Sequence, residues 1–348
     1  MSALSAHVIV RRRAFAVDVA FDVAPGETLA IMGRSGAGKS TILEALAGLQ
    51  ALDGGEISLD GRVIDRAERP RVRIDPMHRG IVLLGQDARL FPHLSVRENV
   101  AFGPRSAGVA AADARSDADR WLAGVGLPGV GERRPAELSG GEQQRVAVAR
   151  ALAANPRAVL LDEPLVALDP VTAGEIRAML RGALRGVTAV AVTHDAVDAA
   201  ALADRLLIVE HGRATQLGPV REVFAAPASA VAARIAGLER VVGRAAGGAW
   251  VGAGARLEST DAESRALAGE DGRALAAVFR AADVRVGATA GNAWRARVTG
   301  VEPTPTGVRL VTDLGAAEIA PLTAIDAAVG DTVMLSIPPD RVRFVPAS

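Results

Sequence analysis

The sequence predicts an α/β domain followed by a smaller all-β domain, and three observations lead to this fold class. The chain has 348 residues, 49% of them hydrophobic, which is enough for two domains with substantial cores. In residues 1–237, short apolar runs alternate with helical stretches. In residues 238–348 the helical period fades, and Gly and Pro separate short apolar stretches, which is typical of a small OB-like β domain.

The apolar runs of the first domain are predicted to be strands of a parallel sheet, because a run without polar alternation fits a strand buried on both faces. The expected strands are residues 28–32, 81–84, 158–161 and 187–192. Residues 40–48 predict a helix, residues of about 87–140 a helical subdomain, and residues 206–217 a hairpin at the sheet edge. The strands expected in the second domain are residues 277–280, 308–312, 332–337 and 341–345.

Composition excludes several classes of protein. The chain lacks cysteine, which rules out a disulfide framework, thiol catalysis and cysteine-based zinc sites. Its 40 basic and 40 acidic residues give zero net charge, which argues against a protein that holds nucleic acid by bulk electrostatics. Residues 1–15 lack the pattern of a signal peptide, and no apolar run reaches the ~18–20 residues that span a bilayer. Any role at a membrane is therefore expected to depend on a partner.

Lys39 is the only lysine among the 40 basic residues, and it lies in a glycine-rich motif. Residues 33–40 match G-x-x-x-x-G-K-[ST] between a predicted strand and a predicted helix, which indicates a phosphate-binding loop. Glycines with positive φ would let backbone N–H groups converge on phosphate oxygens at the helix N-terminus. Lys39 would reach the β- and γ-phosphates and Ser40 would bind Mg²⁺, whereas the alternative is a chance turn. The expected nucleotide-binding residues are Gly33, Arg34, Ser35, Gly36, Ala37, Gly38, Lys39, Ser40 and Thr41.

Two carboxylates end the predicted strand at residues 158–161. Asp162 is expected to hold Mg²⁺, through water, because Mg²⁺ keeps several of its waters in proteins. Glu163 is expected to orient or deprotonate an attacking water, a role worth ~10²–10⁴ in rate. The alternative is an ordinary acidic strand end.

Between these motifs, residues 138–145 read Leu-Ser-Gly-Gly-Glu-Gln-Gln-Arg. Ser139 and Glu142 have the spacing of a capping box that opens a helix. The adjacent Gly140 and Gly141 also make this helix start a candidate anion site, and a simple capped helix is the alternative.

Taken together, these motifs resemble the nucleotide-binding subunits of ABC transporters. The resemblance covers nearly all of residues 1–235 and rests on residues 33–40, Gln86, 138–145, Asp162–Glu163, 167–169 and His194 in this order and spacing. It implies a P-loop ABC nucleotide-binding domain with ATP and Mg²⁺ as cofactors, paired head to tail with a second copy around two ATP molecules. Ser139, Gly140, Gly141 and Glu142 of one copy would then contact ATP held by the other.

The resemblance also implies roles for two further residues. Gln86 would touch Mg²⁺ and report the nucleotide state to the membrane partner, and His194 would contact the γ-phosphate and hold Glu163 in place. Asp169 either contacts across the dimer or caps the helix that begins near Pro170. The family usually stacks an aromatic ring on adenine, but residues 8–13 contain no ring, and Phe15 is nearer to residues 33–40 than that ring usually is. Either stacking on adenine is weak or an arginine replaces the ring, and no residue is assigned to the base.

The single nucleotide-binding domain without membrane spans resembles the free ATPase subunits of bacterial importers, in which residues 90–103 would meet an integral-membrane permease. This implies a location at the cytoplasmic face of the cell membrane, an indirect link to a solute-binding protein and no nucleic-acid partner. The C-terminal domain resembles a TOBE/Mop-type regulatory domain. Within this group the resemblance is greatest to molybdate-transporting ATPases, with sulfate, thiosulfate, polyamine and iron importers as alternatives. The C-terminal domain would bind the transported oxyanion and inhibit transport, or would only assist dimerisation.

Other ABC classes fit the sequence less well. A DNA-repair ATPase would carry a long heptad insertion or zinc cysteines, and a translation-associated protein would carry two nucleotide-binding halves. An exporter with a separate permease is disfavoured by the β extension. A non-catalytic regulatory subunit would be expected to lack Glu163 or His194, and both are present.

Overall fold

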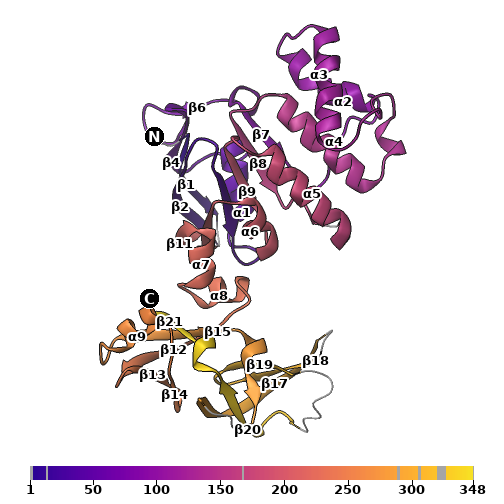
Figure 1. Ribbon diagram of the computed structural model, residues 1–348. Helices are drawn as coiled ribbons and strands as arrows, with labels where there is room; N and C mark the ends of the chain where they lie inside the picture. The colour runs from indigo at the N-terminus through magenta and orange to yellow at the C-terminus, as the bar shows by residue number, and fades with distance from the viewer. Residues whose placement is uncertain are drawn as a thin grey trace. The chain divides into compact units, whose positions relative to one another are not determined.

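The computed structural model describes residues 3–12, 15–166, 168–287, 291–304, 307–319 and 327–347 (Figure 1). Arg13 of segment 8–13 and Ala167 of segment 167–169 lie outside these residues. The chain divides into two compact units, residues 1–220 and 221–348, called here the first and second units.

The first unit is built on a mixed sheet with the strand order β6-β5-β4-β1-β2-β11-β10-β3-β9-β8-β7. The strands are β1 (Leu4–Arg12), β2 (Phe15–Val23), β3 (Thr28–Met32), β4 (Gly54–Leu59), β5 (Arg62–Arg66), β6 (Val72–Arg73), β7 (Ile81–Leu84), β8 (Ala158–Asp162), β9 (Ala189–Val192), β10 (Arg205–Glu210) and β11 (Arg213–Pro219). Strands β10, β3, β9, β8 and β7 are parallel neighbours, whereas β1, β2, β4, β5 and β6 pair antiparallel. The four strands predicted in residues 28–192 are all present and parallel.

Apolar side chains of the parallel strands alternate between two cores, as a strand buried on both faces requires. In β8, Ala158 and Leu160 join the core around α1, whereas Val159 and Leu161 join the core beneath the helical subdomain. The strand thus places residue 162 and those after it at its carboxyl end, between two packed layers.

The two strands of the hairpin predicted at residues 206–217 are present, but the hairpin does not lie at the sheet edge as predicted. Its strands β10 and β11 lie inside the sheet, because β10 pairs with β3 and β11 contacts β2 at Arg213 and Asp18. The antiparallel strands at the N-terminus and in residues 54–73, which the sequence analysis did not include, extend the sheet beyond the hairpin.

The helices of the first unit surround this sheet, and Figure 1 shows α2, α3 and α4 grouped beside its β7 end. The helices are α1 (Lys39–Ala47), α2 (Val96–Ser106), α3 (Ala111–Gly124), α4 (Gly140–Ala153), α5 (Pro170–Ala183) and α6 (Ala196–Leu202), with α7 (Val220–Ala225) at the division and short 3₁₀ turns at Pro76–His78 and Pro135–Glu137. Helices α2 and α3 lie within residues 87–140, for which a helical subdomain is expected, whereas α4 begins at the end of that range.

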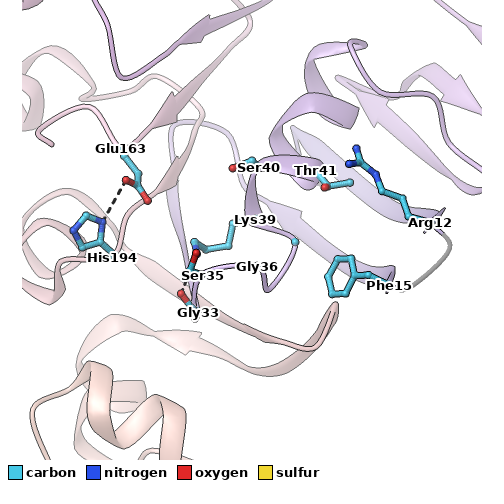
Figure 2. A pocket seen from close by; sticks show the side chains of 11 residues that line it. Arg12, Phe15, Gly33, Ser35, Gly36, Lys39, Ser40, Thr41, Glu163 and His194 are labelled. Atoms are coloured by element: carbon cyan, nitrogen blue, oxygen red, sulfur yellow. Dashed lines mark hydrogen bonds and ion pairs between the residues drawn. The ribbon is translucent and has the colours of Figure 1, made fainter.

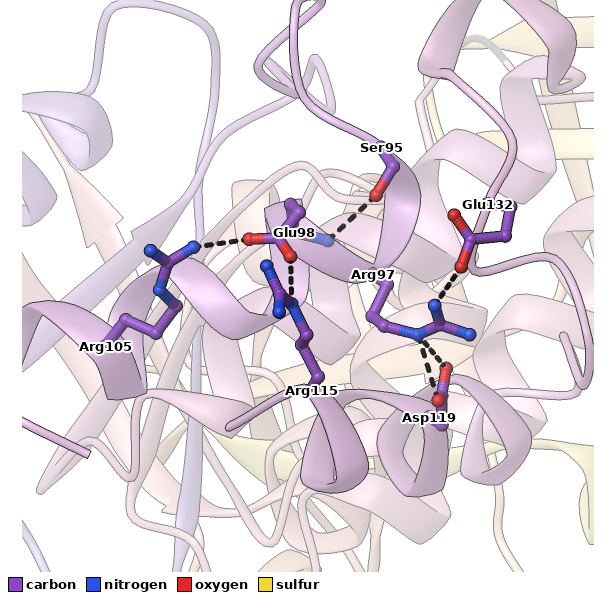
Figure 3. A network of polar contacts seen from close by, with 7 residues as sticks. All are labelled: Ser95, Arg97, Glu98, Arg105, Arg115, Asp119 and Glu132. Carbon is purple, nitrogen blue, oxygen red and sulfur yellow. Dashed lines mark hydrogen bonds and ion pairs between the residues drawn. The ribbon is translucent and has the colours of Figure 1, made fainter. Parts of the chain in front are cut away.

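Ion pairs tie α2 to α3 at the surface of the helical subdomain (Figure 3). Glu98 accepts from Arg105 and Arg115, at 2.5 Å each, and these guanidinium groups, Arg115 first, hold the pKa of Glu98 below its ordinary value. Arg97 donates to Asp119 at 2.8 Å and also pairs with Glu132. Exposed pairs of this kind contribute about 0–1 kcal/mol each, so the packed core dominates the stability of the subdomain.

The second unit consists of two antiparallel sheets with the orders β14-β13-β12-β15-β21 and β16-β20-β17-β18-β19. Its elements are α8 (Ala230–Ile235), β12 (Glu239–Ala246), β13 (Ala249–Gly252), β14 (Ala255–Leu257), α9 (Ala262–Ala268), β15 (Ala274–Phe279), β16 (Arg285–Val286), β17 (Asn292–Thr304), β18 (Gly307–Thr312), β19 (Gly315–Ile319), β20 (Thr332–Ile337) and β21 (Arg343–Pro346), with 3₁₀ turns at Ala281–Asp283 and Pro339–Arg341.

Aromatic side chains from both sheets form the core of the second unit. Trp250 and Phe279 from one sheet and Trp294 from the other are buried together, and the ring centroids of Phe279 and Trp294 are 6.4 Å apart. The observed architecture confirms the predicted fold class, an α/β domain with a helical subdomain and an added OB-like β domain.

No helix in the described part of the chain is both long and apolar enough to cross a membrane.

Candidate functional site

The loop between β3 and α1 is shaped by three glycines with different roles. Gly36 and Gly38 have φ values of 77° and 104°, a region that L side chains rarely adopt. Gly33 does not share this conformation, contrary to the sequence argument. It is required instead by close packing, since a Cβ atom there would lie 2.1 Å from the carbonyl oxygen of Val209. Gly38 is the N-cap of α1, so the first N–H groups of that helix face the loop.

Lys39 is held inside this loop with only 8% of its surface exposed. Its Nζ donates to the carbonyl oxygens of Gly33 at 2.9 Å and Arg34 at 3.1 Å. Burial lowers the pKa of Lys39, while the negative charges of Glu163 and Asp162 act in the opposite direction. The ammonium group is therefore partly desolvated beside the helix N-terminus, an arrangement that favours an anionic ligand.

A cavity of about 520 Å³ opens over the loop (Figure 2). It is lined by Arg12, Phe15, Gly33, Ser35, Gly36, Gly38, Lys39, Ser40, Thr41, Glu163 and His194. Figure 2 shows Glu163 and His194 at one side, Lys39 in the middle, and Arg12 with Phe15 at the opposite side. The cavity thus has an end with a carboxylate and an imidazole, and an end with an aromatic ring and a guanidinium.

The carboxylates arise at the end of β8, as the sequence indicates. Glu163 has a φ of 47°, an unfavourable conformation for a residue with a side chain, and its N–H donates to the carbonyl of Val192 at 3.0 Å. Burial raises the pKa of Asp162, and the charges of Glu163 and Glu44 raise it further against the effect of Lys39. The structure therefore holds a destabilised negative charge next to the phosphate loop.

His194 follows β9 and lies next to Glu163 at the same side of the cavity. The distance between His194 Nδ1 and Glu163 Oε2 is 3.4 Å, and Figure 2 shows the two side chains facing each other. The His194 side chain is 61% exposed and that of Glu163 is 21% exposed, so the pair is open to a ligand from the cavity side.

Ser139 and Glu142 form the predicted capping box at the start of α4. The Glu142 N–H donates to Ser139 Oγ at 3.3 Å, and the Ser139 N–H donates to Glu142 Oε2 at 2.8 Å. Hydrogen bonds from Ser139 hold the pKa of Glu142 below its ordinary value. The four residues 139–142 do not line the cavity of their own chain.

Four other predicted residues, Gln86, Arg34, Ala37 and Asp162, are not among those that line the cavity. Gln86 is exposed two residues after β7. Asp169 caps α5, because its Oδ1 accepts from the N–H groups of Val171 and Thr172 at 3.1 Å each, which is the local interpretation of that residue.

Neither Arg12 nor Phe15 was assigned to the site from the sequence, but both residues line the cavity. Phe15 begins β2 next to the phosphate loop, where a Cβ atom on Gly38 would lie 3.1 Å from the ring atom Cζ. The available signal was the alternation of apolar and polar residues in 15–23, which predicts a strand. In the structure this strand pairs with residues 4–12, and the pairing brings the end of one strand and the start of the next to the loop.

The residues at the loop fit a magnesium nucleotide better than a metal bound by protein alone. Among the described residues, no group of three or more His, Cys, Asp or Glu side chains could hold a metal ion. Mg²⁺ in nucleotide sites typically takes one or two protein oxygens, phosphate oxygens and waters, and Ser40 and Asp162 offer oxygens of this kind.

Comparison with known proteins finds similarity to proteins of ABC transporters. The ABC transporter family matches residues 16–166. The molybdenum import ATP-binding protein ModC of Mycobacterium tuberculosis is 46% identical over 249 residues, 70% of this chain and 67% of the relative. The Fe(3+) ions import ATP-binding protein FbpC of Streptomyces coelicolor is 46% identical over 246 residues, 68% of each chain. The solved structure of cbiO1 from Clostridium perfringens, part of the ABC transporter complex cbiONQ, is 28% identical with a TM-score of 0.57, covering 64% of this chain and 91% of that chain.

The loop geometry, the carboxylates after β8 and the capped helix of residues 138–145 occur in a fold and a sequence shared with these proteins. The chain therefore belongs to the ATP-binding proteins of the ABC transporter family.

Proposed function

We propose that the chain binds ATP in the cavity over residues 33–41 and hydrolyses it to drive molybdate import through a separate membrane permease. The observation that carries this proposal is the placement of buried Lys39 and the α1 N-terminus in one cavity with the Glu163–His194 pair. These groups supply phosphate binding and water activation at neighbouring points.

In this proposal the triphosphate lies along the loop. The N–H groups at the start of α1 and the Lys39 ammonium stabilise its negative charge. Because burial partly desolvates this ammonium, it binds phosphate oxygens more strongly than a solvent-exposed one would. Mg²⁺, when bound with the nucleotide, neutralises phosphate charge, and Ser40, Asp162 and Gln86 are the residues proposed to hold it.

Glu163 is the proposed base. It faces the cavity, and its carboxylate can accept a proton from a water that attacks the terminal phosphate. His194, 3.4 Å from Glu163, orients that carboxylate and donates to the terminal phosphate. The left-handed backbone at Glu163 suits this role, because strained residues are kept where the surrounding structure fixes them for function.

A second copy of the chain is proposed to complete the site. Residues 139–142 do not line their own cavity, yet they present N–H groups at the N-terminus of the 14-residue helix α4. Head-to-tail pairing would place Ser139, Gly140, Gly141 and Glu142 against the terminal phosphate bound by the partner copy.

The permease is proposed to dock on an exposed apolar surface of the first unit. The surface lies in residues 90–103, where the side chain of Phe102 is 47% exposed and the rings of Phe91 and Phe102 have centroids 4.7 Å apart. Arg150 lies over Phe91 at 5.2 Å and donates to the carbonyls of Ala88 and Arg89, which links α4 to the segment after Gln86. Docking here would put the chain at the cytoplasmic face of the membrane, where the permease in turn meets a solute-binding protein.

The transported solute is the finer part of the proposal. Support for molybdate is the identity to the molybdenum relative and the OB-like second domain, proposed as residues 238–348 and as regulatory. The iron relative has the same identity, so Fe³⁺ import is the second candidate.

The test is a reconstituted transporter containing this chain and its permease. Molybdate and tungstate are expected to accumulate in ATP-loaded vesicles and to change the rate of ATP hydrolysis. Uptake of Fe³⁺, sulfate or a polyamine without uptake of molybdate would overturn the assignment of the solute but keep the ATPase. Hydrolysis that is absent in every condition would overturn the proposed function itself.

A further inference from the structure

The base end of the cavity has an unusual composition, and the inference drawn from it rests on the proposed function. If the terminal phosphate lies between Lys39 and Glu163, the nucleobase must extend toward Arg12 and Phe15, at the opposite side in Figure 2. Base recognition therefore falls to these two side chains.

Phe15 alone cannot select a base. The chain has no Tyr, three Trp and seven Phe, and Phe15 is the only aromatic residue among those that line the cavity. Stacking on an aromatic ring is tolerant of sequence, because every base has a π-face. Phe15 can thus hold a purine without distinguishing adenine from guanine.

Strand alternation directs Arg12 toward the cavity. Val8 and Val10 of β1 are buried in the core that contains α1, and Arg12 continues this same face of the strand. Arg11, the next residue back, lies on the other face and does not line the cavity. Figure 2 shows the Arg12 guanidinium beside Thr41, at the rim of the cavity.

The contacts that the Arg12 guanidinium makes with the described residues leave some of its hydrogen-bond donors available. Its NH2 group donates to Gln50 Oε1 at 3.2 Å, and the Glu44 carboxylate lies 4.0 Å away. The pair with Glu44 is exposed on both sides, at 56% and 45%, so it is weak. A guanidinium has five N–H donors, so the bond to Gln50 fixes the group in place and leaves other donors available.

We propose that Arg12 is a specificity-determining residue that reads the edge of the nucleobase. Arginine only donates, and guanine offers two adjacent acceptors, O6 and N7, whereas adenine offers N7 next to a donating amino group. The cavity therefore binds guanine nucleotides at least as tightly as adenine nucleotides. The proposed site therefore differs from one whose shape selects adenine.

The test measures equilibrium dissociation constants of MgATP and MgGTP on the full chain, by displacement of a fluorescent nucleotide. The proteins are the wild type, Arg12→Gln, Arg12→Ala and the matched control Arg11→Gln, each checked by thermal unfolding. Glutamine pairs with the N6 and N7 groups of adenine, so Arg12→Gln should shift the GTP-to-ATP preference toward ATP by about fivefold or more. Arg12→Ala should weaken GTP more than ATP, and Arg11→Gln should match the wild type.

The outcomes separate this inference from the proposed function. Equal weakening of ATP and GTP in both Arg12 variants would mean that Arg12 contacts only the phosphates or sugar, and would overturn the base-reading role while keeping the ATP site. An unchanged ratio in both variants would overturn it as well. A wild-type chain that binds neither nucleotide would overturn the proposed function and this inference together.

Discussion

Two aspartates, one in each unit, show how charge is used differently along this chain. In the first unit, burial and the neighbouring Glu163 and Glu44 raise the pKa of Asp162. In the second unit, hydrogen bonds from the backbone N–H and hydroxyl of Ser264 lower the pKa of Asp261, which is the N-cap of α9. The stabilised carboxylate of Asp261 caps a helix, whereas the destabilised carboxylate of Asp162 is suited to bind a cation. The contrast indicates that the functional unit can be recognised by a carboxylate whose ionised form the surrounding structure destabilises.

The largest effect on ATP binding is expected at the buried cation of the first unit, Lys39. Lys39→Arg should weaken ATP binding roughly 10- to 100-fold, because a planar, longer head group cannot occupy the space between Gly33 and Arg34 and still meet the phosphates. A titration with a fluorescent ATP analogue checks this, with thermal unfolding to confirm that the fold is retained. Unchanged affinity would remove Lys39 from the proposed site.

The next prediction sharpens the contrast by disturbing the second unit alone. A Cβ atom on Gly243 would lie 2.5 Å from Trp250 Cε2 and 2.6 Å from the carbonyl oxygen of Val251. Gly243→Ala should therefore lower the free energy of unfolding by ~1–3 kcal/mol through overpacking, measured by denaturant titration. The matched control is Gly300→Ala, where the nearest atom is 3.5 Å away and the change should be small. ATP hydrolysis per folded chain should not change, and a large loss would show that the units are not separate in function.

A smaller effect is expected from removing the stabilised carboxylate. Asp261→Ala should lower stability by ~1 kcal/mol at pH 7, because α9 loses its cap. The folded-state pKa of Asp261 is depressed, so its contribution is present above the unfolded value of about 3.9 and is lost as the pH falls through the folded value. Denaturant titrations at pH 7 and at acid pH check this, and a pH-independent difference would contradict it.

The smallest effect on stability should have the opposite sign. Asp162→Asn should raise the stability of the nucleotide-free chain by ~1 kcal/mol or less at pH 7, because it removes a partly buried charge that Glu163 repels. The folded-state pKa of Asp162 is raised, so the penalty exists at neutral pH and disappears below the unfolded value of about 3.9. The same variant should lose magnesium-dependent ATP hydrolysis. A destabilised Asp162→Asn chain would show that the carboxylate is structural.

Local sequence patterns predicted much of the first unit. Apolar runs 28–32, 81–84 and 158–161 form parallel strands, and the loop residues from Gly33 to Thr41 are contiguous, so most of them share one cavity. Glu163 and His194 join them because parallel strands present their carboxyl ends at one edge of a sheet.

Non-local contacts account for what the sequence patterns could not predict. The hairpin of β10 and β11 is placed inside the sheet by strands far away in the sequence, whereas Arg12 and Phe15 reach the cavity through the local pairing of β1 with β2. The need for Gly33 comes from the backbone of Val209, 176 positions further along the chain by its number. Such contacts depend on tertiary packing and leave no periodic signal in the sequence.

The central claim, that Glu163 activates water for an ATP held by Lys39, is tested most directly by comparing wild type and Glu163→Gln in one experiment. Equilibrium ATP binding and single-turnover phosphate release are measured with Mg²⁺ on the same preparations. We expect Glu163→Gln to bind ATP as tightly as the wild type and to release phosphate ~10²–10⁴-fold more slowly. Phosphate release at close to the wild-type rate would contradict it.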